Sequence, residues 1–430
     1  MKLEGINALV VGMEKSGQAV VAFLRARGAT VTATDLKPRD IPGFRLQSDE
    51  VFGATWDLIV LSPGVPADLP ALNAARDRGI NVIGEIELAA PFLRGKIIGI
   101  TGSNGKTTTT SLTGHILSSA GVPVQIGGNI GTPVVAMTET SRDDQWNVIE
   151  LSSFQLETSR TFRAHVGICL NVTQNHLDRH RTMENYIAAK SNLFRMQQEG
   201  SYAVLNAADP ICRTFADLTP ATKAWFSRAD IREDQVFLGN KLLMPLADIP
   251  IPGLHNAENV MAAAHAASIA GVPLDKIAAA VRTFHAVEHR LEFTAEINGV
   301  RYYNDSKATS VDAAMKAIDS FPGNLWVILG GTDKGSDYRI MREKLAAKAK
   351  AAILIGAAEE KITKHLQGAL PLIHAGTIAQ AIQQASAKAK PGDTVLLAPA
   401  CSSFDQFQNY EQRGRVFKQL VKDLQHGAAA

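Results

Sequence analysis

Short apolar runs rich in β-branched residues recur along the chain, separated by longer stretches of mixed polarity. The runs lie at residues 8–11, 31–34, 58–61, 97–100, 148–151, 166–170, 203–205, 326–329, 352–355 and 394–397. Each has the length and composition of a buried strand. Intervening stretches such as 17–28, 107–120 and 257–270 show helical spacing. Because parallel sheets covered by helices produce this alternation, the pattern predicts an α/β fold.

Two breaks in the pattern divide the chain. Segment 91–96 contains Pro and Gly and separates a helical stretch from the next strand. Segment 285–290 precedes an amphipathic strand that ends at Asn298-Gly299, a hairpin signal. We therefore predict three domains, at residues 1–94, 95–290 and 291–430. The length of 430 residues agrees with roughly 150 residues per domain.

Composition and charge narrow the class of protein. Lys and Arg number 44 and Asp and Glu 42, a formal charge of +2, which is too balanced for a nucleic-acid-binding face. The three cysteines form no CxxC pair, so neither a zinc site nor a disulfide framework is indicated. No stretch approaches the roughly 20 apolar residues of a membrane helix, and the start does not resemble a secretory signal. We expect a cytoplasmic monomer that binds neither nucleic acid nor membranes.

The most informative motif is TGSNGKTT at 101–108, which follows an apolar run and opens a helical stretch. Backbone N–H groups and a helix start suit phosphate, Lys106 suits the β/γ oxygens, and the Thr107 hydroxyl suits Mg²⁺. The motif is shorter than GxxxxGK[ST], whose first glycine position falls on Ile100. We interpret it as an ATP-binding loop, the alternative being a chance glycine-rich turn. The predicted nucleotide contacts here are Gly102, Ser103, Asn104, Gly105, Lys106, Thr107 and Thr108.

Three more side chains are candidates for chemistry beside this loop. Glu150 ends one predicted strand and His176 follows another, at the sheet edge where such folds bind ligands. Both side chains suit divalent ions. The alternatives are that Glu150 caps a helix or forms an ion pair, and that His176 is an ordinary loop histidine. Lys190, on a predicted helix at 184–194, is interpreted as a surface lysine on sequence alone. Buried beside metals, it would have a lowered pKa and could react with CO₂ to form a metal-binding carbamate. His176 and His180 have a zinc-like spacing but lack the Glu of HExxH, so we do not expect zinc.

Nine ordered segments together resemble the Mur ligase family. They are TGSNGKTT, ELSSFQLET (150–158), NVTQNHLDRH (171–180), AAK (188–190), GLHNAENVMAA (253–263), EHR (288–290), NDSKATS (304–310), GGTDKGSDY (330–338) and PACSSFDQFQNYEQRG (399–414). The resemblance covers nearly the whole chain, and its last three segments resemble the members that add D-glutamate. It implies an N-terminal Rossmann-like domain for the UDP end of UDP-N-acetylmuramoyl-L-alanine, a central P-loop ATPase-type domain with a mainly parallel sheet, and a C-terminal Rossmann-like domain that brings D-glutamate.

The resemblance also implies catalytic, metal and nucleotide roles. Lys106, Glu150, His176 and Lys190 would be catalytic. Thr107 and Glu150 would hold the Mg²⁺ that bridges the ATP phosphates, and His176 with carbamylated Lys190 would hold a second Mg²⁺. Asn256 and Asn259 would contact adenine or ribose, with helix capping as the alternative, while Arg290 and Asp305 would close over the nucleotide.

Two substrate sites complete the set. Predicted contacts with the UDP-linked substrate are Gly12, Asp35, Ser62, Gly64 and Asn129. The family often has Gly where Glu14 stands, and the absent GxGxxG makes an NAD site a weak alternative. The implied D-glutamate contacts are Lys307, Thr309, Lys334, Ser403 and Tyr410, the last replacing the family's usual Phe.

The implied activity is ligation driven by ATP. ATP would phosphorylate the carboxylate of UDP-N-acetylmuramoyl-L-alanine, and the D-glutamate amine would displace phosphate from the acyl phosphate, giving ADP and phosphate. Another Mur-type or folylpolyglutamate-type amino-acid ligase is the nearest alternative. An ATP-hydrolysing regulatory protein and an NAD-dependent oxidoreductase are the rivals from other classes.

Overall fold

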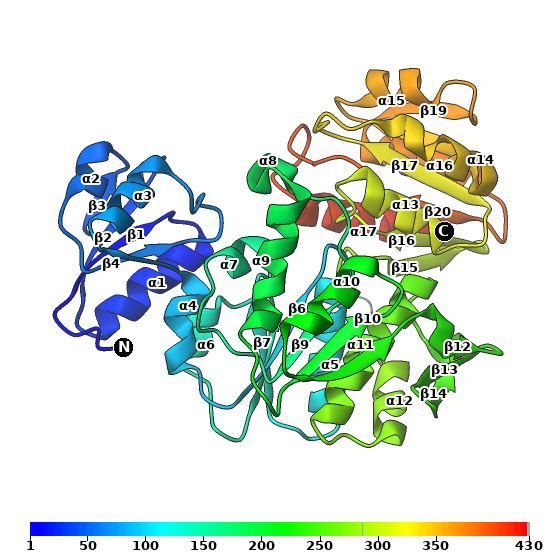
Figure 1. The fold of residues 1–430 in the computed structure, drawn as a ribbon. Coiled ribbons are helices and arrows are strands. Elements are labelled where there is room, and N and C mark those ends of the chain that lie inside the picture. Colours follow the sequence, from blue (N-terminus) through cyan, green and yellow to red (C-terminus); the bar gives the residue numbers. More distant parts are fainter. Residues whose placement is uncertain (286, 428–430) are drawn as a thin grey trace. The chain divides into compact units, whose positions relative to one another are not determined.

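Three large sheets flanked by helices organise the chain (Figure 1), as the α/β prediction requires. The computed structural model describes residues 1–285 and 287–427. All ten predicted strands are present, and the helices predicted at 17–28, 107–120 and 257–270 are α1 (Lys15–Ala26), α5 (Lys106–Ser119) and α11 (Leu254–Ile269). No helix in these described ranges is long and apolar enough to cross a bilayer.

The first sheet is parallel and has the order β3-β2-β1-β4-β5, typical of a Rossmann-like half. Its strands are β1 (Asn7–Val11), β2 (Thr30–Asp35), β3 (Phe44–Leu46), β4 (Leu58–Leu61) and β5 (Asn81–Gly84). Its helices are α1, α2 (Asp49–Gly53), α3 (Pro70–Asp77) and α4 (Glu85–Ala89), which continues into η1 (Ala90–Phe92). The strand order reverses between β1 and β4, where Gly12 and Ser62 follow the two strands.

The second sheet is also parallel, with the order β11-β10-β9-β6-β8-β7. Its strands are β6 (Lys96–Thr101), β7 (Val124–Gly128), β8 (Trp146–Glu150), β9 (Val166–Cys169), β10 (Tyr202–Asn206) and β11 (Thr222–Phe226). Helical segments are α5, α6 (Val134–Met137), α7 (Ser153–Glu157), α8 (Leu177–His180), α9 (Met183–Arg195), α10 (Pro210–Thr214), η2 (Phe215–Leu218), η3 (Arg228–Asp230), η4 (Leu246–Asp248), α11 and α12 (Leu274–Arg282). A small antiparallel sheet of β12 (Ile231–Arg232), β13 (Gln235–Leu238) and β14 (Lys241–Pro245) follows β11.

The third sheet has the order β15-β16-β20-β17-β18-β19 and is parallel except for the β15–β16 hairpin. Its strands are β15 (Glu292–Ile297), β16 (Val300–Asn304), β17 (Leu325–Gly330), β18 (Ala349–Ile355), β19 (Leu372–Gly376) and β20 (Thr394–Leu397). Its helices are α13 (Val311–Asp319), η5 (Tyr338–Met341), α14 (Arg342–Lys348), α15 (Glu359–Leu366), α16 (Ile378–Lys388) and α17 (Tyr410–Gly427). Asn298 and Gly299 have φ of 51° and 75°, as a two-residue hairpin turn requires, so the predicted hairpin is confirmed.

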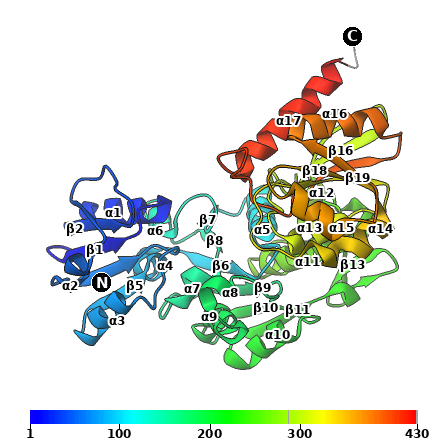
Figure 2. The same cartoon turned by 90° about the horizontal axis from the view of Figure 1, so that it is seen from above.

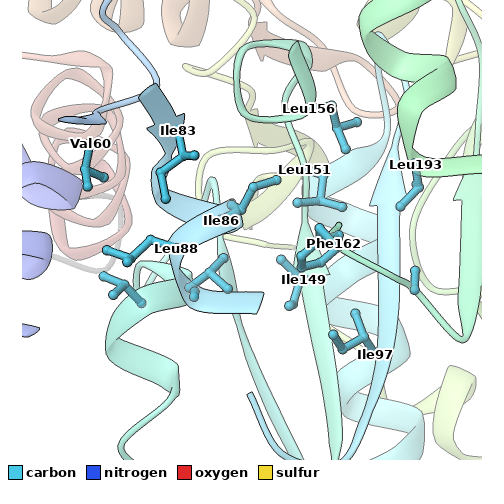
Figure 3. Close-up of a cluster of buried hydrophobic side chains, with 14 of the residues drawn as sticks. Val60, Ile83, Ile86, Leu88, Ile97, Ile149, Leu151, Leu156, Phe162 and Leu193 are labelled. Atoms are coloured by element: carbon cyan, nitrogen blue, oxygen red, sulfur yellow. The ribbon is translucent and has the colours of Figure 1, made fainter. Parts of the chain in front are cut away.

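The first and second sheets share one hydrophobic core (Figure 3). Ile83 from β5 and Ile149 from β8 belong to the same buried cluster as Ile86 and Leu88 from α4, which lies between the two sheets. Figure 2 shows α6 beside α1 at the same junction. Residues 1–246 and 258–282 therefore form one compact unit, and residues 247–257 with those from 283 onward form a second. The domain boundaries near residues 94 and 290 stay a prediction.

Candidate active site

The loop between β6 and α5 has the glycine conformations of a phosphate-binding turn. Gly102 has φ of 149° and Gly105 has φ of 84°, in the region that favours glycine. Gly105 is the N-cap of α5, and a Cβ there would collide with Oδ1 of Asn259 on α11. The loop is thus packed against Asn259, one of the two asparagines predicted to lie near the nucleotide.

Asn171 holds this loop from the neighbouring strand. Its Oδ1 accepts from the Asn104 N–H at 2.9 Å, its Nδ2 donates to the Asn104 carbonyl at 3.1 Å, and its carbonyl accepts from the Ser103 N–H at 2.8 Å. The N–H groups of Ser103 and Asn104 are therefore already used, and we expect those at the start of α5 to face phosphate. The sequence analysis gave Asn171 no role at this loop; the motif NVTQNHLDRH, which begins with it, was the available signal.

Two lysines converge on one carbonyl of the loop. Lys106 Nζ and Lys190 Nζ each donate to the Gly102 carbonyl at 2.8 Å. Lys190, on α9, is only 1% exposed, so the interpretation as a surface lysine is wrong. Burial, and then the charge of Lys106, lower the pKa of Lys190 to about 7. Near neutral pH, a substantial fraction of this amine is therefore uncharged and nucleophilic.

Glu150 presents a carboxylate oxygen that suits a cation. The residue is 2% exposed, and its Oε1 accepts from Asn129 Nδ2 at 2.8 Å. Its Oε2 is buried and has no hydrogen-bond partner among the residues described. A buried carboxylate oxygen without a hydrogen bond destabilises the fold unless a cation binds to it. Thr107 lies buried at the start of α5, so these two predicted ligands supply oxygen donors of the kind that Mg²⁺ prefers.

His176 is exposed and precedes the one-turn helix α8 in a left-handed conformation, with φ of 54°. Its ring packs edge-on against Phe154, with centroids 4.9 Å apart. His180 is buried instead, and its Nε2 lies 2.9 Å from Ser153 Oγ. Across the described part of the chain, no three His, Cys, Asp or Glu side chains cluster as a metal site.

A cavity of about 720 Å³ lies at the switch point of the first sheet. It is lined by all five residues predicted to contact the UDP-linked substrate, namely Gly12, Asp35, Ser62, Gly64 and Asn129. Ser62 Oγ donates to the Gly12 carbonyl at 2.7 Å, which fixes the loop after β4 against the turn after β1. Gln155 from α7 also lines the cavity; ELSSFQLET contained it, but the sequence did not assign it a role.

Two carboxylates at this cavity, Asp35 and Glu14, lie beside Arg39. Burial alone would raise the pKa of Asp35, but N–H donors from Met13 and Lys37 and the charge of Arg39 lower it, so Asp35 is ionised at neutral pH. Arg39 also pairs with Glu14 at 2.6 Å. Glu14 therefore forms an ion pair at the rim of this cavity.

In the second unit, three loops at the carboxyl ends of β16, β17 and β20 adjoin. Ala400 N–H donates to the Ala308 carbonyl at 2.9 Å, and Thr332 and Ser402 exchange two backbone hydrogen bonds. These loops, the third of which continues into α17 at Tyr410, carry the five residues predicted to contact D-glutamate, namely Lys307, Thr309, Lys334, Ser403 and Tyr410. Lys307 Nζ lies 5.2 Å from the Tyr410 ring centroid, within cation–π range. Lys334 is exposed, and Ser403 is 2% exposed.

Arg413 on α17 ties two of these loops together. Its guanidinium is 1% exposed and donates to the Ser306 hydroxyl and carbonyl and to the carbonyls of Cys401 and Ser402, at 2.8–3.3 Å. Burial lowers its pKa to about 10, so it remains a cation at neutral pH. The motif containing Arg413 was noted in the sequence, but its role was not predicted.

The residues predicted to contact the nucleoside fall into both units. Asn259 belongs to the first unit, whereas Asn256, Arg290 and Asp305 belong to the second. Burial raises the pKa of Asp305 to about 7, although the charge of Arg290 acts against that rise. Their contact with nucleotide stays a prediction.

A phosphate-binding loop on a parallel sheet, with a Rossmann-like sheet before it and another after it in the sequence, defines a three-part α/β nucleotide-binding protein. Comparison with known families agrees. Residues 6–84 match the Mur ligase MurD-like N-terminal domain, residues 100–267 the Mur ligase middle domain, and residues 289–401 the Mur ligase glutamate ligase domain. The chain belongs to the Mur ligase family.

Relatives and solved structures support this assignment. The chain is 62% identical to the UDP-N-acetylmuramoylalanine–D-glutamate ligase of Solibacter usitatus, across 99% of both chains. It is 52% identical to the ligase of that name from Acidobacterium capsulatum, across 100% of this chain and 98% of the relative. The fold resembles UDP-N-acetylmuramate-alanine ligase MurC from Thermotoga maritima, with a TM-score of 0.62, 16% identity, and coverage of 97% and 100%.

Proposed function

We propose that this protein joins D-glutamate to UDP-N-acetylmuramoyl-L-alanine in an ATP-dependent, ADP-forming reaction of peptidoglycan precursor synthesis. The observation that carries the proposal is the phosphate-binding loop with its two converging lysines, in a chain 62% identical over its length to a ligase of that name. We place the reaction in the cytoplasm, where both substrates would meet a monomeric enzyme.

The first step needs a free carboxylate to become a good electrophile. ATP phosphorylates the terminal carboxylate of UDP-N-acetylmuramoyl-L-alanine, and the amine of D-glutamate then displaces phosphate to form the amide. Lys106, at the start of α5, would leave its resting contacts with the Gly102 and Ser103 carbonyls and stabilise the transferring phosphoryl group. The protein thus contributes position and charge, the main requirements of phosphoryl transfer.

Magnesium fits the donor set around this loop. Bound Mg²⁺ would neutralise charge that develops on the phosphate oxygens. Thr107 and Glu150 would hold one ion, since Glu150 Oε2 is buried without a hydrogen-bond partner in the described chain. His176 and Lys190 would hold a second, provided that Lys190 is carbamylated, because an amine that donates to Gly102 offers no oxygen ligand.

The burial of Lys190 favours its carbamylation. Its amine attacks CO₂ only when uncharged, and burial already lowers its pKa to about 7. The product is an anion, which also removes the repulsion between two adjacent ammonium groups at Gly102. We therefore infer that Lys190 acts as a carbamate ligand rather than as an ammonium group.

The two substrates would occupy separate built sites. The cavity around Gly12, Asp35, Ser62, Gly64 and Asn129 would take the UDP-linked substrate. The loops carrying Lys307, Thr309, Lys334, Ser403 and Tyr410 would take D-glutamate, whose two carboxylates suit two ammonium groups and several hydroxyls. Tyr410 replaces the family's usual Phe, and its ring would still cover the substrate methylenes.

A coupled ADP-release assay tests this function. Purified enzyme receives ATP, Mg²⁺ and UDP-N-acetylmuramoyl-L-alanine, and amino acids are supplied one at a time. We expect release to depend on D-glutamate, and ¹⁸O in the substrate carboxylate to pass into phosphate. ADP release that ignores D-glutamate would instead favour a regulatory ATPase, and equal rates with other amino acids would favour another ligase of the family.

A further inference from the structure

The one-turn helix α8 contacts the loop that lines the cavity of the first sheet through the side chain of Arg179. Its Nη2 donates to the Val65 carbonyl at 2.8 Å, and its Nη1 approaches the Gly64 carbonyl at 3.4 Å. Gly64 and Val65 belong to loop 62–66, which lines the cavity. The guanidinium therefore binds two carbonyls of the loop that would contact the UDP-linked substrate.

The same guanidinium is anchored to α7. Its Nη2 also donates to Glu157 Oε2 at 2.8 Å, and its Cζ lies 5.1 Å from the Phe154 ring centroid. The Arg179 side chain is 11% exposed and that of Glu157 28%, so this ion pair is largely shielded from water. A shielded, charge-assisted contact is stronger and better defined than a surface ion pair.

Phe154 relays this contact to His176. The Phe154 ring meets the His176 ring edge-on at 4.9 Å and the His180 ring in a stack at 5.4 Å. A helix of four residues has little stability of its own, so α8 depends on such side-chain contacts. Both residues that flank it, His176 and Arg181, have positive φ, which the surrounding contacts must maintain.

We propose that Arg179 is a positioning residue that couples occupancy of the UDP-substrate cavity to the placement of α8 and His176. Substrate that settles against loop 62–66 fixes the carbonyls gripped by Arg179, and Arg179 in turn fixes α8. The inference rests on the proposed function for the identity of the two ligands. It goes further by naming the side chain through which the sites communicate.

Two substitutions and a matched control test the coupling. Arg179→Met removes the donors and keeps much of the side-chain volume, whereas Arg179→Lys keeps the charge but lacks the planar fork. Arg181→Met is the control, because Arg181 leaves the same helix but its side chain is 74% exposed and pairs with Asp68. Thermal unfolding of all three variants identifies any that fail to fold.

Calorimetry then measures the Kd of UDP-N-acetylmuramoyl-L-alanine with and without a non-hydrolysable ATP analogue and Mg²⁺. We expect the analogue to tighten substrate binding by roughly fivefold or more in the wild type, the usual range for coupled sites. The ratio should fall to about one in Arg179→Met, recover partly in Arg179→Lys, and stay at the wild-type value in Arg181→Met.

A purely structural role would alter the folded fraction or both Kd values and leave their ratio unchanged. A wild-type ratio in folded Arg179→Met, or a wild-type enzyme without coupling, would overturn the inference. Failure of the proposed function would be a separate result. It would appear as ADP release by the wild type that does not depend on D-glutamate, and the two Kd values and their ratio could still be measured.

Discussion

Replacing Arg413 by Met should disconnect the loops that would bind D-glutamate. The buried guanidinium serves the Ser306 hydroxyl and the carbonyls of Ser306, Cys401 and Ser402. Met fills much of the same volume but donates nothing, so three buried carbonyls lose a charged donor. The same change also removes a cation from the neighbourhood of the proposed dicarboxylate site.

The size of the effect follows from these contacts. A buried acceptor left without a partner costs about 1–3 kcal/mol. The Ser402 carbonyl keeps the Thr332 N–H, so the carbonyls of Ser306 and Cys401 give a gross loss of roughly 2–6 kcal/mol. Relief of the buried charge offsets several kcal/mol, since a desolvated cation is itself unfavourable. We expect a net loss of about 2 kcal/mol, concentrated in the second unit.

Hydrogen exchange and steady-state kinetics measure the two consequences. Amides in 304–309 and 399–403 should exchange faster in Arg413→Met, and the KM for D-glutamate should rise by roughly tenfold or more while the KM for ATP changes little. Arg415→Met is the control, because Arg415 is exposed on the same helix. Arg413→Lys should be intermediate. If Arg413→Met matched Arg415→Met in both measurements, the assignment of Arg413 as the tie between these loops would be wrong.

Three further predictions concern the charged groups. Lys190→Ala should lose most activity and regain part of it when short carboxylic acids are added. Full activity without these acids would rule out the carbamate. In the wild-type enzyme at fixed dissolved CO₂, activation should increase as pH rises through about 7, the pKa of Lys190. Glu150→Gln should raise the Mg²⁺ concentration for half-maximal activity, and an unchanged Mg²⁺ titration would exclude Glu150 as a ligand. The pKa of Asp305 is raised to about 7 in the folded protein, so folding favours the protonated carboxyl. Its contribution to the free energy of unfolding is therefore full below about pH 4 and is lost as pH rises through 7. The free energy of unfolding in urea should change less between pH 5 and pH 7.5 for Asp305→Asn than for the wild type. An equal change in the two proteins would refute this account.

Local pattern predicted the regular architecture because buried strands leave a continuous apolar signal. All ten apolar runs became strands, and Asn298-Gly299 became a hairpin turn. The pattern did not predict several strands that have exposed positions. Most residues of β3, β7 and β11 are exposed or half-exposed. The strands β12–β14, which form a small sheet of their own, were also not predicted. Partly exposed strands carry no such run, so hydropathy alone does not mark them.

The sequence also determined the chemistry available, since TGSNGKTT and the ordered family segments specify a phosphate loop and its candidate ligands. Tertiary structure decided which of these groups meet, and in what state. Lys190 is buried at the Gly102 carbonyl, Glu150 retains a buried oxygen without a hydrogen bond among the described residues, and Cys169 and Cys212 bring their sulfurs within 3.3 Å across 43 positions. Spacing along a chain encodes periodicity within one element, whereas these encounters depend on strand order and on burial, which no single segment contains.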